Sequence, residues 1–221
     1  MYERVKMAAV FTYLQPGPKM IWQFDELGYD IDINFNGRTG RKPYVWGEGS
    51  LKYYDDPLRQ YIYETYKVVL KLRETITPEK LLNAIKDHKD TGKTRKLSYS
   101  HADFKLLVFG NFGTSDESIS PKFTKTGKWY NYITGDSIIV ENVNQTINLK
   151  PGEWHIYSTT KYSDGFPDIV ETFDNPVTIS PYPFTPDQEI TITFDAKKAS
   201  KKGSAGLINA NKVYIHSGIV D

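Results

Sequence analysis

Two neighbouring carboxylates, Asp25 and Glu26, follow a short apolar segment near the start of the chain. The apolar segment is residues 19–24; it comes after a Pro-Gly-Pro turn, and Gly28 lies just beyond the acids. Carboxylates at the carboxyl end of a parallel barrel strand could exchange protons with a substrate, because that end of the strand faces the active site. Neighbours on a strand point to opposite faces, so this pair cannot flank one scissile bond unless the strand has already ended. We therefore expect no catalytic residue here.

The irregular stretch over residues 27–54 contains the side chains best suited to hold a ligand. A loop of this length within a compact domain is usually functional. Its glycines and the flat rings of Tyr44 and Trp46 indicate an ordered loop at a binding face, and Arg38 and Arg41, whose proposed role comes from the resemblance given below, lie in the same loop. Each also has a structural alternative, because the arginines could brace the loop and the rings could pack within it. These four residues are our candidate binding residues.

No pattern for a bound metal or cofactor is present in the sequence. The histidines are scattered and lack the spacing of a zinc site. The acidic residues after position 24 lack the alternating order and the terminal glutamate of a calcium-binding EF-hand loop. We therefore expect no metal ligand and no cofactor in this chain. The histidines are His88, His101, His155 and His216.

The composition excludes several classes of protein. Among 221 residues, 28 are Lys or Arg and 27 are Asp or Glu, and the resulting net charge of +1 predicts no nucleic-acid partner. Cysteine is absent, so disulfides and thiolate metal sites are excluded. No apolar run approaches the roughly 20 residues that a membrane-spanning helix needs. With 39% hydrophobic residues, the chain can bury one good core or two small ones.

Hydrophobic periodicity predicts helices and one strand in the N-terminal part of the chain. A helix over residues 3–14 is ended by prolines, and the apolar strand over residues 19–24 follows it. A strong helix over residues 57–74 starts at an Asp-Pro pair, which supplies an N-cap and a proline at the first helical position. A short helix is predicted over residues 81–87.

From residue 95 onward the hydrophobic period changes from about 3.6 to about 2, which is typical of strands. Strands separated by turn residues predict a small antiparallel β-sandwich or a Greek-key sheet. A second β module opens near residue 177, but it contains about three strands where an immunoglobulin-like sandwich needs about seven. The first module's strands are expected over residues 104–110, 129–132, 137–141, 145–149 and 153–157, and those of the second over residues 177–179, 189–194 and 212–216.

Several of these segments, taken in order, resemble the α-amylase family, glycoside hydrolase family 13. The turn, apolar segment and Asp-Glu-Leu-Gly of residues 16–28 are similar to the family's last barrel strand. Residues 40–46 resemble its R-x-P-x-x-W loop, and residues 70–73 resemble the K-L-R end of the helix that follows. Residues 129–135 and 149–153 resemble the W-x-D-x-x-T-G and L-x-P-G-E turns of the family's domain C.

The resemblance implies an α+β fragment. Its parts would be the last β/α units of a (β/α)8 TIM barrel, an antiparallel β-sandwich and a truncated immunoglobulin-like β module. On this basis residues 1–95 are the C-terminal part of the catalytic barrel, and residues 96–163 are domain C. Residues 164–176 are a linker, and residues 177–221 begin an accessory module of the starch-binding kind.

The resemblance also implies a function. The parent would be a retaining hydrolase of α-1,4-glucosidic bonds in starch, with its catalytic carboxylates on earlier barrel strands, so this chain alone is expected to be inactive. In the family, the position of Glu26 carries a structural acid at the barrel end. The position of Arg41 carries an arginine that holds a sugar, helped by an aspartate at the position of Gly37. Glycine there departs from the family pattern.

The implied partners are starch and maltooligosaccharides, bound by the parent enzyme. The resemblance is also compatible with a calcium ion bound by the parent. It implies that the parent is secreted, periplasmic or at the cell surface of a bacterium. The alternative is a non-catalytic carbohydrate-binding or structural β-domain protein, whose aromatic side chains bind glycan without cleaving it.

Overall fold

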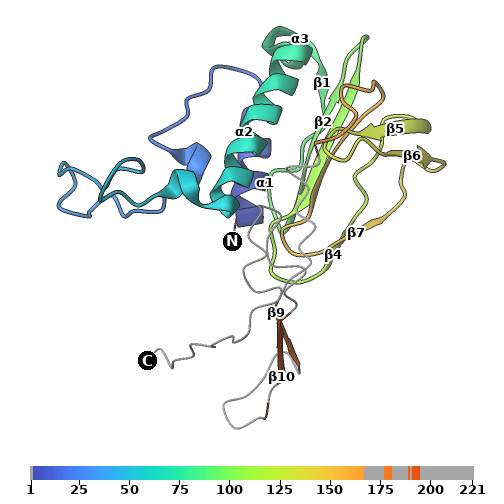
Figure 1. Ribbon diagram of the computed structural model, residues 1–221. Coiled ribbons are helices and arrows are strands. Elements are labelled where there is room, and N and C mark those ends of the chain that lie inside the picture. The colour runs from blue at the N-terminus through green and yellow to red at the C-terminus, as the bar shows by residue number, and fades with distance from the viewer. Residues whose placement is uncertain (1, 167–176, 181–188, 190, 195–221) are drawn as a thin grey trace. The chain divides into compact units, whose positions relative to one another are not determined.

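In the computed structural model, the described residues are 2–166, 177–180, 189 and 191–194 (Figure 1). The chain divides into two units, Met1–Glu171 and Thr172–Asp221. Helices α1 to α3 and strands β1 to β8 belong to the first unit, which also contains the loop with the candidate binding residues.

In the second unit, the described part is a hairpin of two antiparallel strands. These are β9 (Val177–Ser180) and β10 (Thr191–Phe194), paired in register from Val177 opposite Phe194 to Ser180 opposite Thr191. They confirm the first two strands predicted for this region. The third predicted strand, over residues 212–216, lies outside the described residues.

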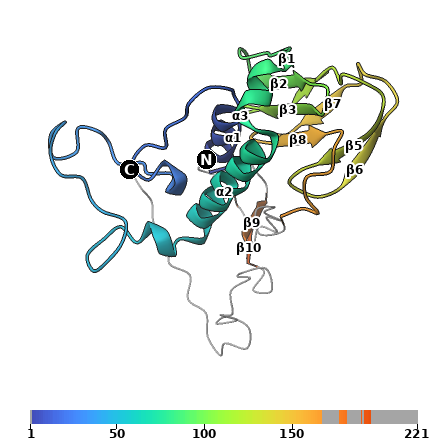
Figure 2. The same cartoon turned by 90° about the horizontal axis from the view of Figure 1, so that it is seen from above.

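Two long helices form most of one layer of the first unit (Figures 1 and 2). α1 (Tyr2–Tyr13) ends just before the prolines, as predicted. α2 (Pro57–Ile76) also starts where predicted, because the Asp56 carboxylate accepts a hydrogen bond from the Leu58 amide at 2.9 Å. This N-cap satisfies one of the amides that a helix start leaves without a partner.

The third helix and the first strand differ from prediction. α3 covers Pro78–Asn83 rather than residues 81–87, because the Thr77 hydroxyl accepts a hydrogen bond from the Lys80 amide and the helix begins at the proline. Part of the predicted helix instead forms β1 (Ile85–Lys86), which pairs with the next strand. Pairing with a sheet edge here overrides local helical propensity.

The barrel strand predicted over residues 19–24 is wrong. This segment is irregular, and most of its apolar side chains are exposed. A parallel barrel strand satisfies its backbone groups through a strand on each side, and no described strand lies beside this segment. The chain turns instead: the Asp25 amide donates to the Trp22 carbonyl at 2.7 Å, and the short 3-10 helix η1 (Asp25–Leu27) follows.

An antiparallel sheet of six strands, in the order β1-β2-β3-β8-β5-β6, packs against the helices (Figure 2). A separate antiparallel pair, β4 and β7, packs on its other face. The antiparallel sheet predicted from residue 95 onward is thus confirmed. Its strands and the pair are β2 (Thr94–Ser100), β3 (Lys105–Asn111), β4 (Glu117–Ile119), β5 (Gly127–Asn131), β6 (Ser137–Val140), β7 (Ile147–Leu149) and β8 (Trp154–Ser158).

Alternating side chains of the central strand β3 divide the interior into two cores. Leu106 and Val108 pack with the helices, in a core that includes buried residues of α1 and α2. Leu107 and Phe109 point the other way and pack with Trp129 and the β4–β7 pair. The six-stranded sheet therefore has an apolar layer on both of its faces.

A buried hydrogen bond joins the segment after β5 to the helix layer. The Tyr132 hydroxyl donates to the Val68 carbonyl of α2 at 2.9 Å. Burial raises the pKa of Tyr132 to about 12, so the hydroxyl keeps its proton near neutral pH.

Tyr132→Phe is expected to lower the free energy of unfolding by about 1–2 kcal/mol, because the ring still packs while the hydrogen bond to Val68 is lost. Urea unfolding followed by circular dichroism measures the change. Tyr130→Phe is the matched control, because Tyr130 is only half-buried; it should stay within about 0.5 kcal/mol of the parent. Equal losses in both variants would contradict a role for this hydrogen bond.

Candidate functional site

The candidate loop, residues 14–56, is attached to α2 by two arginines of that helix. Arg59 and Arg73 lie on the buried face of α2 and are only 5% and 8% exposed. A buried guanidinium is stable only when acceptors satisfy its donors. Here backbone carbonyls of residues 13–28, from the end of α1 to just after η1, supply most of those acceptors.

Arg73 fixes the start of the candidate loop. Its Nη1 donates to the Tyr13 carbonyl at 2.8 Å and to the Gln15 carbonyl, and its Nη2 donates to the Gly17 carbonyl at 2.5 Å. Carbonyls at the end of a helix have no intrahelical partner. Arg73 therefore caps the C-terminal end of α1, which the prolines terminate, and holds the first residues of the loop against α2.

Arg59 fixes the segment after η1. Its Nη1 donates to the carbonyls of Leu27, at 2.9 Å, and Gly28, at 2.5 Å, and its Nη2 pairs with the Asp30 carboxylate at 3.1 Å. The guanidinium also lies 3.5 Å from the ring centroid of Tyr53, whose hydroxyl donates to Asp30 at 2.5 Å. The hydrogen bond from Tyr53, and then Arg59, lower the pKa of Asp30. A charged carboxylate thus joins residue 30 of the loop to Tyr53 near the loop's C-terminal end and to Arg59 of α2.

A row of aromatic rings orders the loop between these anchors. Phe24 makes edge contacts with Trp46, at 5.2 Å between centroids, and with Tyr29, at 5.7 Å. Tyr29 in turn contacts Tyr53 at 6.1 Å, and its hydroxyl donates to the Pro43 carbonyl at 2.6 Å. These contacts bring together residues that are distant in sequence.

The structure brings together some of the candidate binding residues. The Arg41 guanidinium lies 5.6 Å from the ring centroid of Tyr44. The Tyr44 ring is also fixed, because its hydroxyl donates to a carbonyl of the same loop at 3.0 Å. Trp46 joins the row of rings by its edge and is still 56% exposed, so most of its surface is open to a ligand. Arg38 is exposed and belongs to neither contact.

The two carboxylates that follow residue 24 have different neighbours. The Asp25 carboxylate accepts a hydrogen bond from the Trp22 amide at 3.3 Å. Glu26 instead lines a groove of about 510 Å³ along α2, beside Tyr66. Burial raises the pKa of Tyr66, and the charges of Tyr13, Asp25 and Glu26 add to that effect.

The sequence reasoning missed Arg59 and Arg73 as anchors of the loop. The sequence did contain a signal for their burial. Arg59 lies three residues before Ile62, and Arg73 lies four residues after Val69, so both arginines fall on the buried stripe of α2. A charged side chain on a buried stripe needs polar partners. An irregular neighbouring segment, with its free carbonyls, can supply them.

In the part of the chain that the structure describes, no group of three or more histidine, aspartate or glutamate side chains is placed to hold a metal ion. Among the same residues, no helix combines the length and the apolar character needed to cross a membrane. The exposed groups that the loop offers to a ligand include the guanidinium groups of Arg38 and Arg41 and the ring of Trp46, beside carboxylates such as that of Asp32.

Comparisons with known proteins identify the fold. No family model matches the chain, and no curated protein matches it. Among solved structures, the chain is similar to the α-amylase from Geobacillus thermoleovorans complexed with acarbose, with 13% identity and a TM-score of 0.54. It is also similar to a mutant of AmyP in complex with maltotriose, with 16% identity and a TM-score of 0.51. A third similar structure is a mutant of the trehalulose synthase MutB, from crystals soaked with trehalulose. Its sequence identity to this chain is 18% and its TM-score is 0.51.

These matches involve most of this chain but a minor part of each neighbour. The α-amylase match covers 73% of this chain and 34% of that one, the AmyP match covers 73% and 35%, and the MutB match covers 71% and 38%. The chain thus spans little more than a third of the structures that it matches. At these identities the likeness concerns the fold: this chain folds like a part of the α-amylase and trehalulose synthase structures.

Proposed function

We propose that this chain is the C-terminal part of a starch-degrading, α-amylase-type glycoside hydrolase that cleaves α-1,4-glucosidic bonds with retention of configuration. The observation that carries the proposal is the shared fold with structures in complex with acarbose and maltotriose. In this proposal residues 1–95 are the C-terminal part of the catalytic barrel, represented here by helices α1 to α3 and the candidate loop and not by a strand over residues 19–24, and residues 96–163 are domain C. Residues 164–176 are a linker, and residues 177–221 begin an accessory module.

The chemistry is assigned to a part of the parent outside this chain. Retaining hydrolysis needs two carboxyl groups about 5–5.5 Å apart across the scissile bond. Asp25 binds the Trp22 amide, whereas Glu26 lines the groove along α2, so these two acids have different surroundings. We assign Glu26 to support of the barrel end, and we expect the isolated chain not to hydrolyse maltoheptaose.

The candidate loop is assigned to sugar binding. The Arg41 guanidinium, held over Tyr44, has donors for the hydroxyl groups of a sugar. The exposed ring of Trp46 offers a flat surface for the apolar face of a pyranose, and Phe24 supports it from the edge. Arg38, exposed on the same loop, adds a second source of donors.

The test uses the whole reading frame that contains this chain. Its product should release reducing sugar from starch, and NMR of the first product should find the α anomer, as retention requires. A product that binds maltotriose without cleaving starch would refute the proposal that the parent is an enzyme. It would support the alternative of a non-catalytic carbohydrate-binding protein, which the exposed rings favour. Turnover by the 221-residue chain itself that is lost in Glu26→Gln would contradict the assigned place of the chemistry.

Trp46→Ala is expected to weaken binding of maltotriose to the chain about tenfold, or about 1.4 kcal/mol, because the stacking surface is lost. Calorimetric titration measures the dissociation constant. Phe35→Ala is the matched control, because Phe35 is an aromatic side chain of the same loop that is 50% exposed. Undiminished binding in Trp46→Ala would mean that this ring only packs within the loop.

A further inference from the structure

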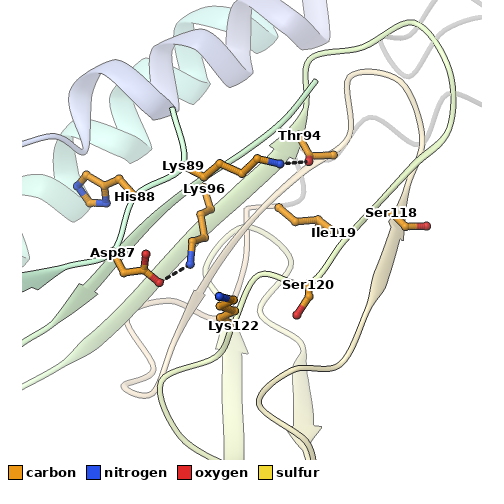
Figure 3. Close-up of a pocket in the computed structure, with 9 residues that line it drawn as sticks. All are labelled: Asp87, His88, Lys89, Thr94, Lys96, Ser118, Ile119, Ser120 and Lys122. Atoms are coloured by element: carbon orange, nitrogen blue, oxygen red, sulfur yellow. Dashed lines mark hydrogen bonds and ion pairs between the residues drawn. The ribbon is translucent and has the colours of Figure 1, made fainter. Parts of the chain in front are cut away.

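A polar cavity of about 300 Å³ lies at the β1–β2 edge of the six-stranded sheet (Figure 3). Its walls come from residues 87–96, on the β1–β2 side, and residues 118–122, in and after β4. None of the candidate binding residues of the loop lines it. It is therefore a separate place on the molecule that a ligand can enter.

Two lysines of this cavity are directly opposite each other across the β1–β2 connection. Lys89 and Lys96 exchange both backbone hydrogen bonds, each at 2.9 Å. In such a pair the Cα atoms are about 5.5 Å apart and the side chains leave the same face, and like charges in this arrangement are destabilising. The Lys96 side chain is only 7% exposed. The fold thus starts two lysine side chains from neighbouring positions on one face and buries one of them, and their ammonium groups reach two different parts of the same cavity wall.

A single carboxylate compensates part of this charge. The Lys96 ammonium pairs with Asp87 at 2.5 Å (Figure 3), and this hydrogen bond is the main cause that lowers the pKa of Asp87. The charge of Lys122 lowers it further, so Lys122 acts on the same carboxylate. Burial lowers the pKa of His88, whose Nδ1 accepts a hydrogen bond from the Ser98 amide, so this ring is neutral near pH 7. Two ammonium groups, those of Lys96 and Lys122, therefore act on one carboxylate, and the lining holds Lys89 as a third ammonium group, which has no carboxylate partner of its own among the described residues.

The cavity also offers more hydrogen-bond donors than acceptors. Each ammonium group carries three N–H donors. In the described part of the chain, Lys89 donates to the Thr94 hydroxyl at 3.0 Å and Lys96 donates to Asp87, while no salt bridge joins Lys122 to a carboxylate. No tryptophan, tyrosine or phenylalanine lines the cavity, so it lacks the flat face that a neutral sugar would need.

The backbone of Lys122 is held in a conformation that lysine rarely adopts. Its φ is +55°, in the left-handed region. The next residue, Phe123, is buried in the core below β4 and β7, and its amide donates to the Val143 carbonyl at 2.9 Å. These contacts fix Lys122 in place, and such strain in a cavity wall is characteristic of ligand sites.

We propose that this cavity binds a phosphate group through the ammonium groups of Lys89, Lys96 and Lys122. A phosphate is small, carries between one and two negative charges near neutral pH and is rich in acceptors, so it matches the excess of positive charge and of donors. Inorganic phosphate and the phosphate ester of a sugar share this chemistry. The proposal does not depend on the proposed function, because none of the loop residues takes part.

The test is calorimetric titration of the 221-residue chain with inorganic phosphate at low salt, where we expect saturable binding with a Kd of about 1 mM or tighter. The double variant Lys89→Gln/Lys122→Gln should weaken binding about tenfold or more, because two of the three ammonium groups are lost. Lys125→Gln/Lys128→Gln is the matched control: it removes the same charge from exposed lysines outside the cavity lining. It should change the Kd less than about twofold.

The same titration with glucose 1-phosphate distinguishes the source of the phosphate. Glucose, which carries no phosphate, is the control ligand and should not bind. Tighter binding of glucose 1-phosphate than of inorganic phosphate identifies an ester as the ligand, and equal binding identifies the free ion; both support the site. Equal losses in the two double variants would mean diffuse attraction and would overturn the proposal. Absence of saturable binding with both phosphates, in protein that circular dichroism finds folded, would overturn it as well.

Discussion

Arg59→Met is expected to lower the free energy of unfolding by about 3–5 kcal/mol, which is a large share of the stability of a typical domain. Methionine keeps the apolar stem but removes the donors to the buried carbonyl of Leu27 and the half-buried carbonyl of Gly28. An unsatisfied buried carbonyl costs about 1–3 kcal/mol, and the half-buried one adds a smaller part. The Asp30 carboxylate also loses its guanidinium partner.

Urea unfolding, followed by circular dichroism and by tryptophan fluorescence, measures this loss. Arg38→Met is the matched control, because it makes the same chemical change at an exposed position of the candidate loop. That control should stay within about 0.5 kcal/mol of the parent. A loss below about 1 kcal/mol in Arg59→Met would show that water or other groups satisfy these carbonyls instead.

Elements whose signals are local could be predicted from the sequence. α2 begins at Pro57 because the Asp56 cap and the proline both act within one turn. The strands from residue 95 onward follow from alternation of apolar and polar side chains, which the two apolar layers on either side of β3 explain. In each case the information lies within a few residues of the element itself.

Elements that depend on a distant partner could not be predicted in this way. The apolar segment over residues 19–24 has the composition of a strand, but no described strand lies beside it and its backbone turns into η1. The opposite error occurred at β1, where pairing with Tyr99 and Ser100 of β2 replaces a helix that the local sequence favours. Register between segments, rather than propensity, decides both cases.

In the candidate site, too, contacts between near neighbours in sequence could be predicted, and contacts between distant segments could not. The contact of Arg41 with Tyr44 joins near neighbours in sequence, so a role for both in one surface was open to prediction. The contact of Phe24 with Trp46, and the anchoring of Leu27 and Gly28 by Arg59, join segments far apart in the chain. Binding of a sugar by these residues stays a prediction, which the Trp46→Ala titration tests.

Gly135→Ala is expected to lower the free energy of unfolding by about 3 kcal/mol or more, because it adds a steric clash to backbone strain. The φ of Gly135 is +78°, and a Cβ there would lie 2.1 Å from the Asp164 carbonyl oxygen and 2.8 Å from the Gly165 nitrogen. Both obstacles are backbone atoms, which cannot rotate away as a side chain can. A hydrogen bond next to this contact also holds the two segments together, because the Phe166 amide donates to the Ile133 carbonyl at 2.7 Å.

Gly127→Ala separates the two causes of this loss. Gly127 has a φ of +105°, but a Cβ there would meet nothing within 4 Å. It should therefore show the backbone strain alone, about 1–2 kcal/mol by urea unfolding. The difference between the two variants measures how firmly residues 164–165 are held against the turn at Gly135. If Gly135→Ala lost no more than Gly127→Ala, that segment would have to move aside at little cost, and its hydrogen bonds to the turn would contribute little to stability.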